Sequence, residues 1–178
     1  MGGFADALAL SAVTSGAPAV SLVRRDQTKT GWGVTLEAPV GEDAGLFLRM
    51  SRNNGRAETY AFTEIDHQVS LGGQFSGAAW GRRADRWGVA LAVNGLSNTH
   101  RDYLAAGGLG FFLGDGALNY GPERVFETYY QFALPDWASR AGKVQSAVSA
   151  GFQHLTNPGY NRDRGPVRIF SLRWHSEF

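Results

Sequence analysis

The stretch Phe170–Phe178, FSLRWHSEF, decides the fold class of this sequence. Because side chains alternate between the two faces of a β-strand, its pattern predicts a strand with one apolar and one polar face. A soluble protein would use such a strand in its core, whereas an outer-membrane barrel would turn the apolar face to lipid. The apolar set is Phe170, Leu172, Trp174 and Phe178, and the polar set is Ser171, Arg173, His175 and Glu177.

The same alternation recurs along the chain, and helical periodicity is scarce. Valine, leucine, isoleucine and aromatic residues fall on one face of each segment, and charged residues, amides, serine and glycine fall on the other. The pattern predicts about eight antiparallel strands in a single β-barrel domain over residues 1–178. The predicted strands are 17–25, 31–40, 44–51, 63–76, 86–94, 125–134, 143–155 and 170–178.

Short and long links alternate between these segments. This alternation is typical of up-and-down transmembrane barrels, which have short periplasmic turns and longer external loops. A sandwich with Greek-key connections would not sort its links in this way. The short links are 40–45, 80–86 and 135–142, and the long links are 52–61, 97–122 and 156–166.

The amino-acid composition narrows the classes of protein to which this chain can belong. The chain has 178 residues, 43% hydrophobic and 19% charged, which suits one folded domain. A net charge of +1 gives no electrostatic reason to expect nucleic acid as a partner. Cysteine is absent, which excludes disulfides and thiolate metal sites. No apolar run approaches the roughly 18 residues of a membrane helix, so any membrane contact would be made by strands. The first residues lack the basic region of a secretory signal, and we expect none in this chain.

Aromatic residues gather near the predicted strand ends, and lysine is rare, with only Lys29 and Lys143 in the chain. Amphipathic rings at strand ends form the girdles of membrane barrels at the bilayer boundaries. The residues predicted for these membrane interfaces are Trp32, Trp87, Trp174 and Phe178.

Several motifs taken together resemble the carbohydrate-selective porin (OprB-like) family of bacterial outer membranes, from about residue 30 to the end. They are Trp80-Gly81-Arg82 with Asp85-Arg86, Gly114-Asp115-Gly116, Glu127 with Tyr130, Asn157-Pro158, and Arg164-Gly165-Pro166.

The resemblance implies the C-terminal half of a sixteen-stranded porin. It implies passive, sugar-selective diffusion across the bacterial outer membrane, with no enzyme activity and no cofactor. It further implies mono- or oligosaccharides, outer-membrane lipids, lipopolysaccharide and the barrel-assembly machinery as partners.

The polar face supplies the candidate lumen. Its acids and bases balance, and amides and tyrosine supplement them, which suits neutral sugars whose hydroxyls both donate and accept hydrogen bonds. The same charges could instead pair with one another inside a small barrel. The predicted lining residues are Glu37, Arg49, Glu64, Asp66, Gln68, Glu127, Tyr129, Gln131, Arg173 and His175.

The remaining motifs do not predict a catalytic, nucleotide-binding or metal-binding site. The glycines of GGLGFFLGDG (107–116) do not have dinucleotide-loop spacing, so an external loop that caps the barrel or folds into the pore is expected. Neither H-E-x-x-H nor G-x-S-x-G occurs, and no metal site is predicted. The loop NRDRGP (161–166) could contact lipopolysaccharide phosphates, but an Asp–Arg-pinned turn is favoured.

The alternative is a non-conducting small barrel or a soluble, ligand-binding β-barrel. A soluble barrel places the apolar face in its core, whereas a porin exposes it. The residues that discriminate the two are Leu36, Leu71, Leu91, Phe132 and Leu172.

Overall fold

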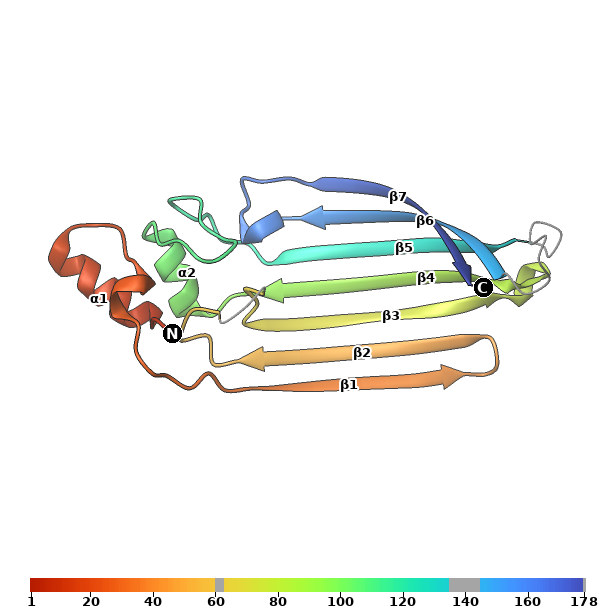
Figure 1. Ribbon diagram of the computed structural model, residues 1–178, viewed down its shortest axis with the longest axis horizontal. Coiled ribbons are helices and arrows are strands. Elements are labelled where there is room, and N and C mark those ends of the chain that lie inside the picture. Colours follow the sequence, from red (N-terminus) through yellow and green to blue (C-terminus); the bar gives the residue numbers. More distant parts are fainter. Residues whose placement is uncertain (60–62, 135–144, 178) are drawn as a thin grey trace.

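The computed structural model of the chain describes residues 1–59, 63–134 and 145–177. One antiparallel sheet dominates it, with its strands in chain order from β1 to β7 (Figure 1). The all-β, up-and-down architecture predicted from the alternation is therefore confirmed. The strands are β1 (Gly31–Val40), β2 (Ala44–Asn53), β3 (His67–Gly77), β4 (Arg82–Gly95), β5 (Glu123–Ala133), β6 (Gln145–Thr156) and β7 (Val167–Glu177).

The strands are long for a globular protein. The shortest have 10 residues and the longest has 14. A strand tilted in a bilayer needs about 9–11 residues to cross the hydrocarbon layer. Every described strand therefore has the length that crossing requires. None of the described helices is long and apolar enough to span a membrane.

One strand prediction is wrong, and the start of another strand is misplaced. The segment 17–25 contains the short 3₁₀ helix η1 (Val20–Val23), not a strand. Val20 is buried there among loop residues, and its backbone N–H donates to the hydroxyl of Tyr103 at 3.4 Å. The strand expected from residue 63 begins only at His67. Seven strands are described where about eight were predicted.

The links sort by length between the two ends of the sheet, as predicted (Figure 1). Residues 41–43 join β1 to β2, and residues 78–81, with the 3₁₀ helix η2 (Ala78–Trp80), join β3 to β4. The link expected at 135–142 lies outside the described residues. The long links 54–66, 96–122 and 157–166 all lie at the opposite end, which we call the loop end.

The loop end has a small core of its own. Helix α1 (Phe4–Thr14), the 3₁₀ helix η4 (Pro158–Tyr160) and helix α2 (Asn98–Ala105) lie there. The alternation did not predict α1, which buries only Phe4 and Ala7 and leaves apolar residues such as Val13 exposed. The buried cluster comprises Phe4, Ala7, Val20, Leu96, Tyr103, Leu104, Leu118 and Tyr160.

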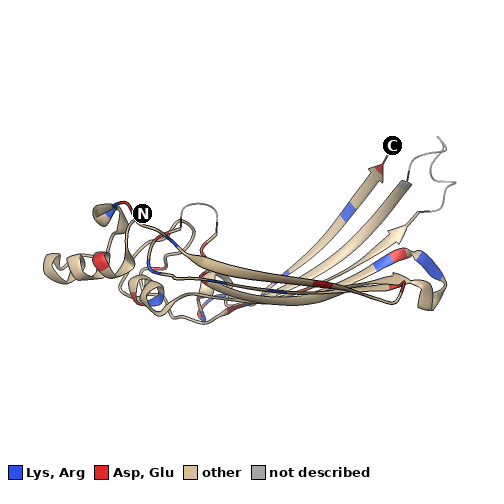
Figure 2. Cartoon of the chain, turned by 90° about the horizontal axis from the view of Figure 1, so that it is seen from below, with Lys and Arg blue, Asp and Glu red and all other residues tan. Residues whose placement is uncertain are grey.

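The sheet itself has no covered core. It is curved (Figure 2), and β1 and β7, its two edges, each pair with only one neighbour among the described strands. Charged residues are denser toward the two ends of the molecule, with a few along the strands between them (Figure 2). Register places most apolar residues of the strands on one face and most polar ones on the other; we call these the apolar face and the polar face.

The apolar face is exposed. The exposed fractions are 58% for Leu36, 52% for Leu71, 49% for Leu91, 40% for Phe132 and 79% for Leu172. The soluble-barrel alternative expected these five side chains in a core, and the structure contradicts that expectation.

Candidate functional site: the polar face of the sheet

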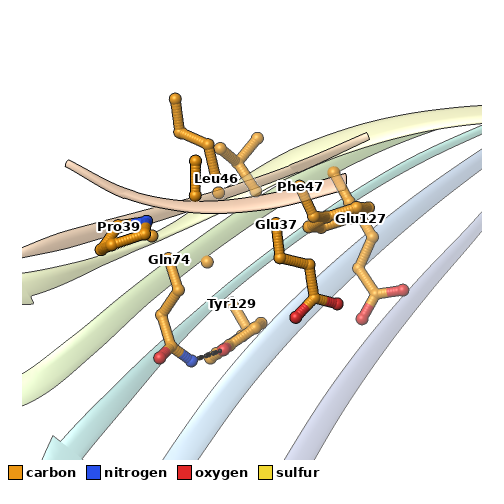
Figure 3. Close-up of a pocket in the computed structure, with 13 residues that line it drawn as sticks. Glu37, Pro39, Leu46, Phe47, Gln74, Glu127 and Tyr129 are labelled. Carbon is orange, nitrogen blue, oxygen red and sulfur yellow. Dashed lines mark hydrogen bonds between the residues drawn. The ribbon is translucent and has the colours of Figure 1, made fainter. Parts of the chain in front are cut away.

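A hollow of about 540 Å³ lies on the polar face of strands β1 to β5, toward the short-turn ends of β1 to β3 and over the middle of β4 and β5. Figure 3 shows its polar side chains projecting together on one side of the sheet, while Leu46 projects to the other side. Strand alternation produces this arrangement, because the lining side chains occupy matching positions in register on neighbouring strands. The side chains that project into it include Glu37, Phe47, Gln74, Glu127 and Tyr129.

Tyr129 is the best-defined group in the hollow. Its ring lies over Gly88 on the neighbouring strand, where a Cβ atom would come within 2.2 Å of the ring. Gln74, one strand further on, donates from Nε2 to the Tyr129 hydroxyl at 2.6 Å (Figure 3). Only a glycine at position 88 leaves room for the ring. The tyrosine is thereby held against the sheet, with its hydroxyl hydrogen still able to donate.

Phe47, on β2 and three strands from Tyr129, repeats this arrangement. A Cβ atom on Gly72 would come within 2.7 Å of its ring. The guanidinium of Arg49 lies 5.1 Å from the ring centroid and pairs with Glu37 at 3.3 Å. Both charged side chains are more than half exposed, so this pair contributes little to stability and stays accessible to a solute.

Toward the C-terminal strands the polar face continues with hydrogen-bonded groups. Gln153 donates from Nε2 to Glu127 at 2.7 Å. A second hollow of about 410 Å³ lies near the short turns, where Gln131 and His175 are among its lining residues. His175 lies 3.1 Å from the carboxylate of Glu177.

Most of the predicted lining residues share the polar face. Register places eight of them together across five strands, and the hollow brings Glu37, Glu127 and Tyr129 closest. Gln74 and Phe47 also line it; their inward positions follow from the same alternation. The eight are Glu37, Arg49, Gln68, Glu127, Tyr129, Gln131, Arg173 and His175.

Glu64 and Asp66 do not lie on the polar face, because β3 begins only after them. Both carboxylates are buried at the loop end, with 7% and 3% of the residue exposed. Glu64 accepts hydrogen bonds from the backbone N–H groups of three consecutive residues, 111–113, at 2.7–2.9 Å. The glycine-rich stretch 107–116 is therefore fastened to the strand entry by one carboxylate.

Asp66 pairs with a residue that the sequence did not identify. Its carboxylate lies 2.9 Å from Nδ1 of buried His100 and accepts from the backbone N–H of Ser97 at 2.9 Å. The His100 ring stacks on Phe4 at 4.1 Å between centroids. Burial raises the pKa of Asp66, but the hydrogen bonds from His100 and Ser97 and the charge of Lys29 outweigh it, so the net pKa is lowered. No sequence motif joins positions this far apart.

The loop 161–166 is fastened by a different ion pair from the one expected. Arg164 pairs with Asp115, in the glycine-rich stretch, and not with Asp163. Asn161 also donates to Asp115, at 2.5 Å, and Asn119 donates to Asp163 at 2.9 Å. The turn is held by a neighbouring loop.

The predicted interface tryptophans all lie on the apolar face. Trp32 is near the loop end of β1, whereas Trp87 and Trp174 are near the short-turn ends of β4 and β7. They are 54%, 40% and 68% exposed. Phe178 lies outside the described residues. Within the described ranges, no group of three acidic or histidine side chains is arranged to hold a metal ion.

The arrangement offers a solute exposed aromatic rings, amides and balanced charges along a sheet whose other face is apolar. The family model described as carbohydrate-selective porin, OprB family, matches residues 4–178. The chain belongs to the OprB family. It is a family of channels in the bacterial outer membrane, not of enzymes, and the match confirms the resemblance seen in the sequence. Neither the curated proteins nor the solved structures yield a match to the chain.

Proposed function

We propose that this chain forms part of the wall of an outer-membrane channel through which sugars diffuse passively. The observation that carries the proposal is the division of the sheet into two faces. The apolar face is exposed, as a lipid-facing wall requires, and the polar face holds the hollow. Family membership supplies the substrate class, carbohydrates.

Tyr129 is the residue we assign to sugar contact. The face of an aromatic ring carries partial negative charge and attracts the C–H hydrogens of a pyranose ring. Around it, the amide of Gln74, the carboxylate of Glu127 and the tyrosine hydroxyl can exchange hydrogen bonds with sugar hydroxyls. Contacts of this kind are weak and reversible. Conduction needs such contacts, because a solute must be able to leave each site.

The test is the current through planar bilayers containing the refolded chain, measured while methyl glucopyranoside is added. We expect the sugar to reduce the current. Tyr129→Leu should weaken the block about two- to tenfold, since an aromatic contact contributes about 0.5–1.5 kcal/mol. Gly88→Ala should act similarly, because the new methyl group would displace the ring.

The matched control is Phe170→Leu, which removes an aromatic ring from the apolar face, where Phe170 is 79% exposed. It should leave the sugar block unchanged. Channels that conduct without block by any sugar would contradict sugar selection. Failure of the folded chain to conduct would instead favour the non-conducting barrel.

A further inference from the structure

Apart from the ion pair of Arg82 with the buried Asp85 at the short-turn end of β4, the charged or titratable residues of the apolar face are all basic. Over the rest of the described strands this face carries three arginines and two histidines and no aspartate or glutamate. All acidic residues of the sheet lie on the polar face or at the strand ends next to the short turns. We call the five residues the basic row: Arg52, His67, Arg124, His154 and Arg168.

The basic row lies on the loop side of the apolar band. Arg52 is the second-last residue of β2, Arg124 the second residue of β5, and Arg168 the second residue of β7, all at the loop end of their strands. Arg52 and His67 are register partners on neighbouring strands, as are His154 and Arg168. Trp87 and Trp174 lie toward the short-turn side of the apolar face, whereas Trp32 is the register partner of Arg52 on the loop side.

The row also follows the slant expected of a membrane boundary. The register gives the position of each arginine along its strand. Arg124 on β5 lies two residues nearer the short turns than Arg52 does on β2, three strands away. Arg168 on β7 lies two residues nearer still, two strands beyond Arg124. With about 3.3 Å per residue and about 4.8 Å between strands, this is a slope of roughly 30°. Trp87 and Trp174 are displaced in the same direction, by two residues over three strands. Strands tilted by about 35–45° would bring such a slanted line close to level in the bilayer.

The three arginines are exposed, and none forms an ion pair with a carboxylate of the described part of the chain. This sets them apart from Arg49, which faces the other way and pairs with Glu37. An unpaired guanidinium facing lipid is costly in hydrocarbon but favourable beside a phosphate, which it can bind through two parallel hydrogen bonds.

We propose that the basic row binds the phosphate groups of lipid A, the anionic lipid portion of lipopolysaccharide, in the outer leaflet. Long loops mark the external side of up-and-down outer-membrane barrels, so the row lies at the level of the outer-leaflet head groups. At the opposite boundary, toward the periplasmic phospholipids, Arg82 lies over the ring of Phe132 on the apolar face, but its guanidinium pairs with Asp85, which also accepts from the Tyr130 hydroxyl. That boundary therefore has a neutralised ion pair where the loop side has unpaired arginines. The proposal rests on the outer-membrane location and is independent of sugar transport.

The test measures binding of bisphosphorylated lipid A to the full chain folded in neutral detergent, by native mass spectrometry at two salt concentrations. The probes are bisphosphorylated lipid A, the same lipid without phosphates, and phosphatidylglycerol. We expect the phosphorylated lipid A to bind most tightly, and less tightly at high salt because its contacts are ionic. Arg52→Gln/Arg124→Gln/Arg168→Gln should reduce this binding at least tenfold.

The matched control is Arg49→Gln/Arg173→Gln, which removes two arginines from the polar face of two of the same strands. It should bind lipid A like the wild type. A second variant with lysine at the three row positions keeps the charge, guards against misfolding of the glutamine variant, and should retain part of the affinity. Equal losses in the row and control variants, or equal binding of lipid A without phosphates, would overturn the proposal. Equally tight, row-dependent binding of phosphatidylglycerol would overturn the assignment to lipid A.

Discussion

Asp66 shows how one buried carboxylate joins parts of the chain that are distant in sequence. It contacts the N-terminal part of α2 through His100 and the cap residue Ser97, and Lys29 approaches it to 3.8 Å. Its folded pKa is lower than its ordinary value, because these partners outweigh the effect of burial. The free energy of folding that Asp66 contributes through these partners therefore depends on pH.

The sign of this dependence follows from linkage. An unfolded aspartate titrates near pH ~3.9, and the folded carboxyl titrates lower. The stabilisation from ionised Asp66 is complete above the pKa of the unfolded aspartate. It is lost as the pH falls through the lower pKa of the folded protein. We expect the loop-end core, followed by near-UV circular dichroism, to loosen in that acid range.

Asp66→Asn should remove this acid dependence and lower stability at neutral pH by about 1.5–3 kcal/mol, the usual contribution of a hydrogen bond to a charged group. Denaturant titrations at neutral and acid pH check both effects. An unchanged acid profile in the variant would show that another carboxyl controls it.

At the scale of elements, the carboxylate of Glu64 holds residues 111–113 within the glycine-rich stretch 107–116. Glu64→Ala should release these three residues, because their backbone donors lose their acceptor. Hydrogen exchange at the amides of residues 111–113 should then accelerate at least tenfold, a loss of about 1.4 kcal/mol or more in local stability. Glu42→Ala, in the turn at the other end and with a side chain 89% exposed, should leave these amides unchanged.

The strands were predictable because one rule, alternation, governs them. The segment 31–40 is a strand with the predicted ends, and the polar set of 170–178 lies on the polar face as expected. The rule misplaced Glu64 and Asp66, because the alternating pattern already begins in the buried loop that precedes β3. Their partners lie 31–49 residues away, which no local pattern reveals. Helix α1 escaped prediction because apolar residues occur nearly all round it.

At the scale of the molecule, the two faces of the sheet require different environments. Leu91→Arg places a charge on the apolar face, where a lipid-facing arginine costs about 2–4 kcal/mol at the bilayer midplane. Ala90→Arg places the same residue on the polar face, next to the hollow. Folding into lipid bilayers, followed by urea titration, should show a large loss for Leu91→Arg and a much smaller one for Ala90→Arg. Similar losses for both variants would contradict a lipid-facing apolar face.

The two edges of the sheet have a geometric consequence. Direction reverses at each of the six steps from β1 to β7, so both edge strands run the same way. Direct contact of β7 with β1, within one copy or between copies rotated about the channel axis, would create a parallel junction. A wall that is antiparallel throughout therefore needs an odd number of strands between these edges, whichever polypeptide supplies them. Any wall with an even total of strands, including the sixteen implied by the sequence resemblance, meets this condition.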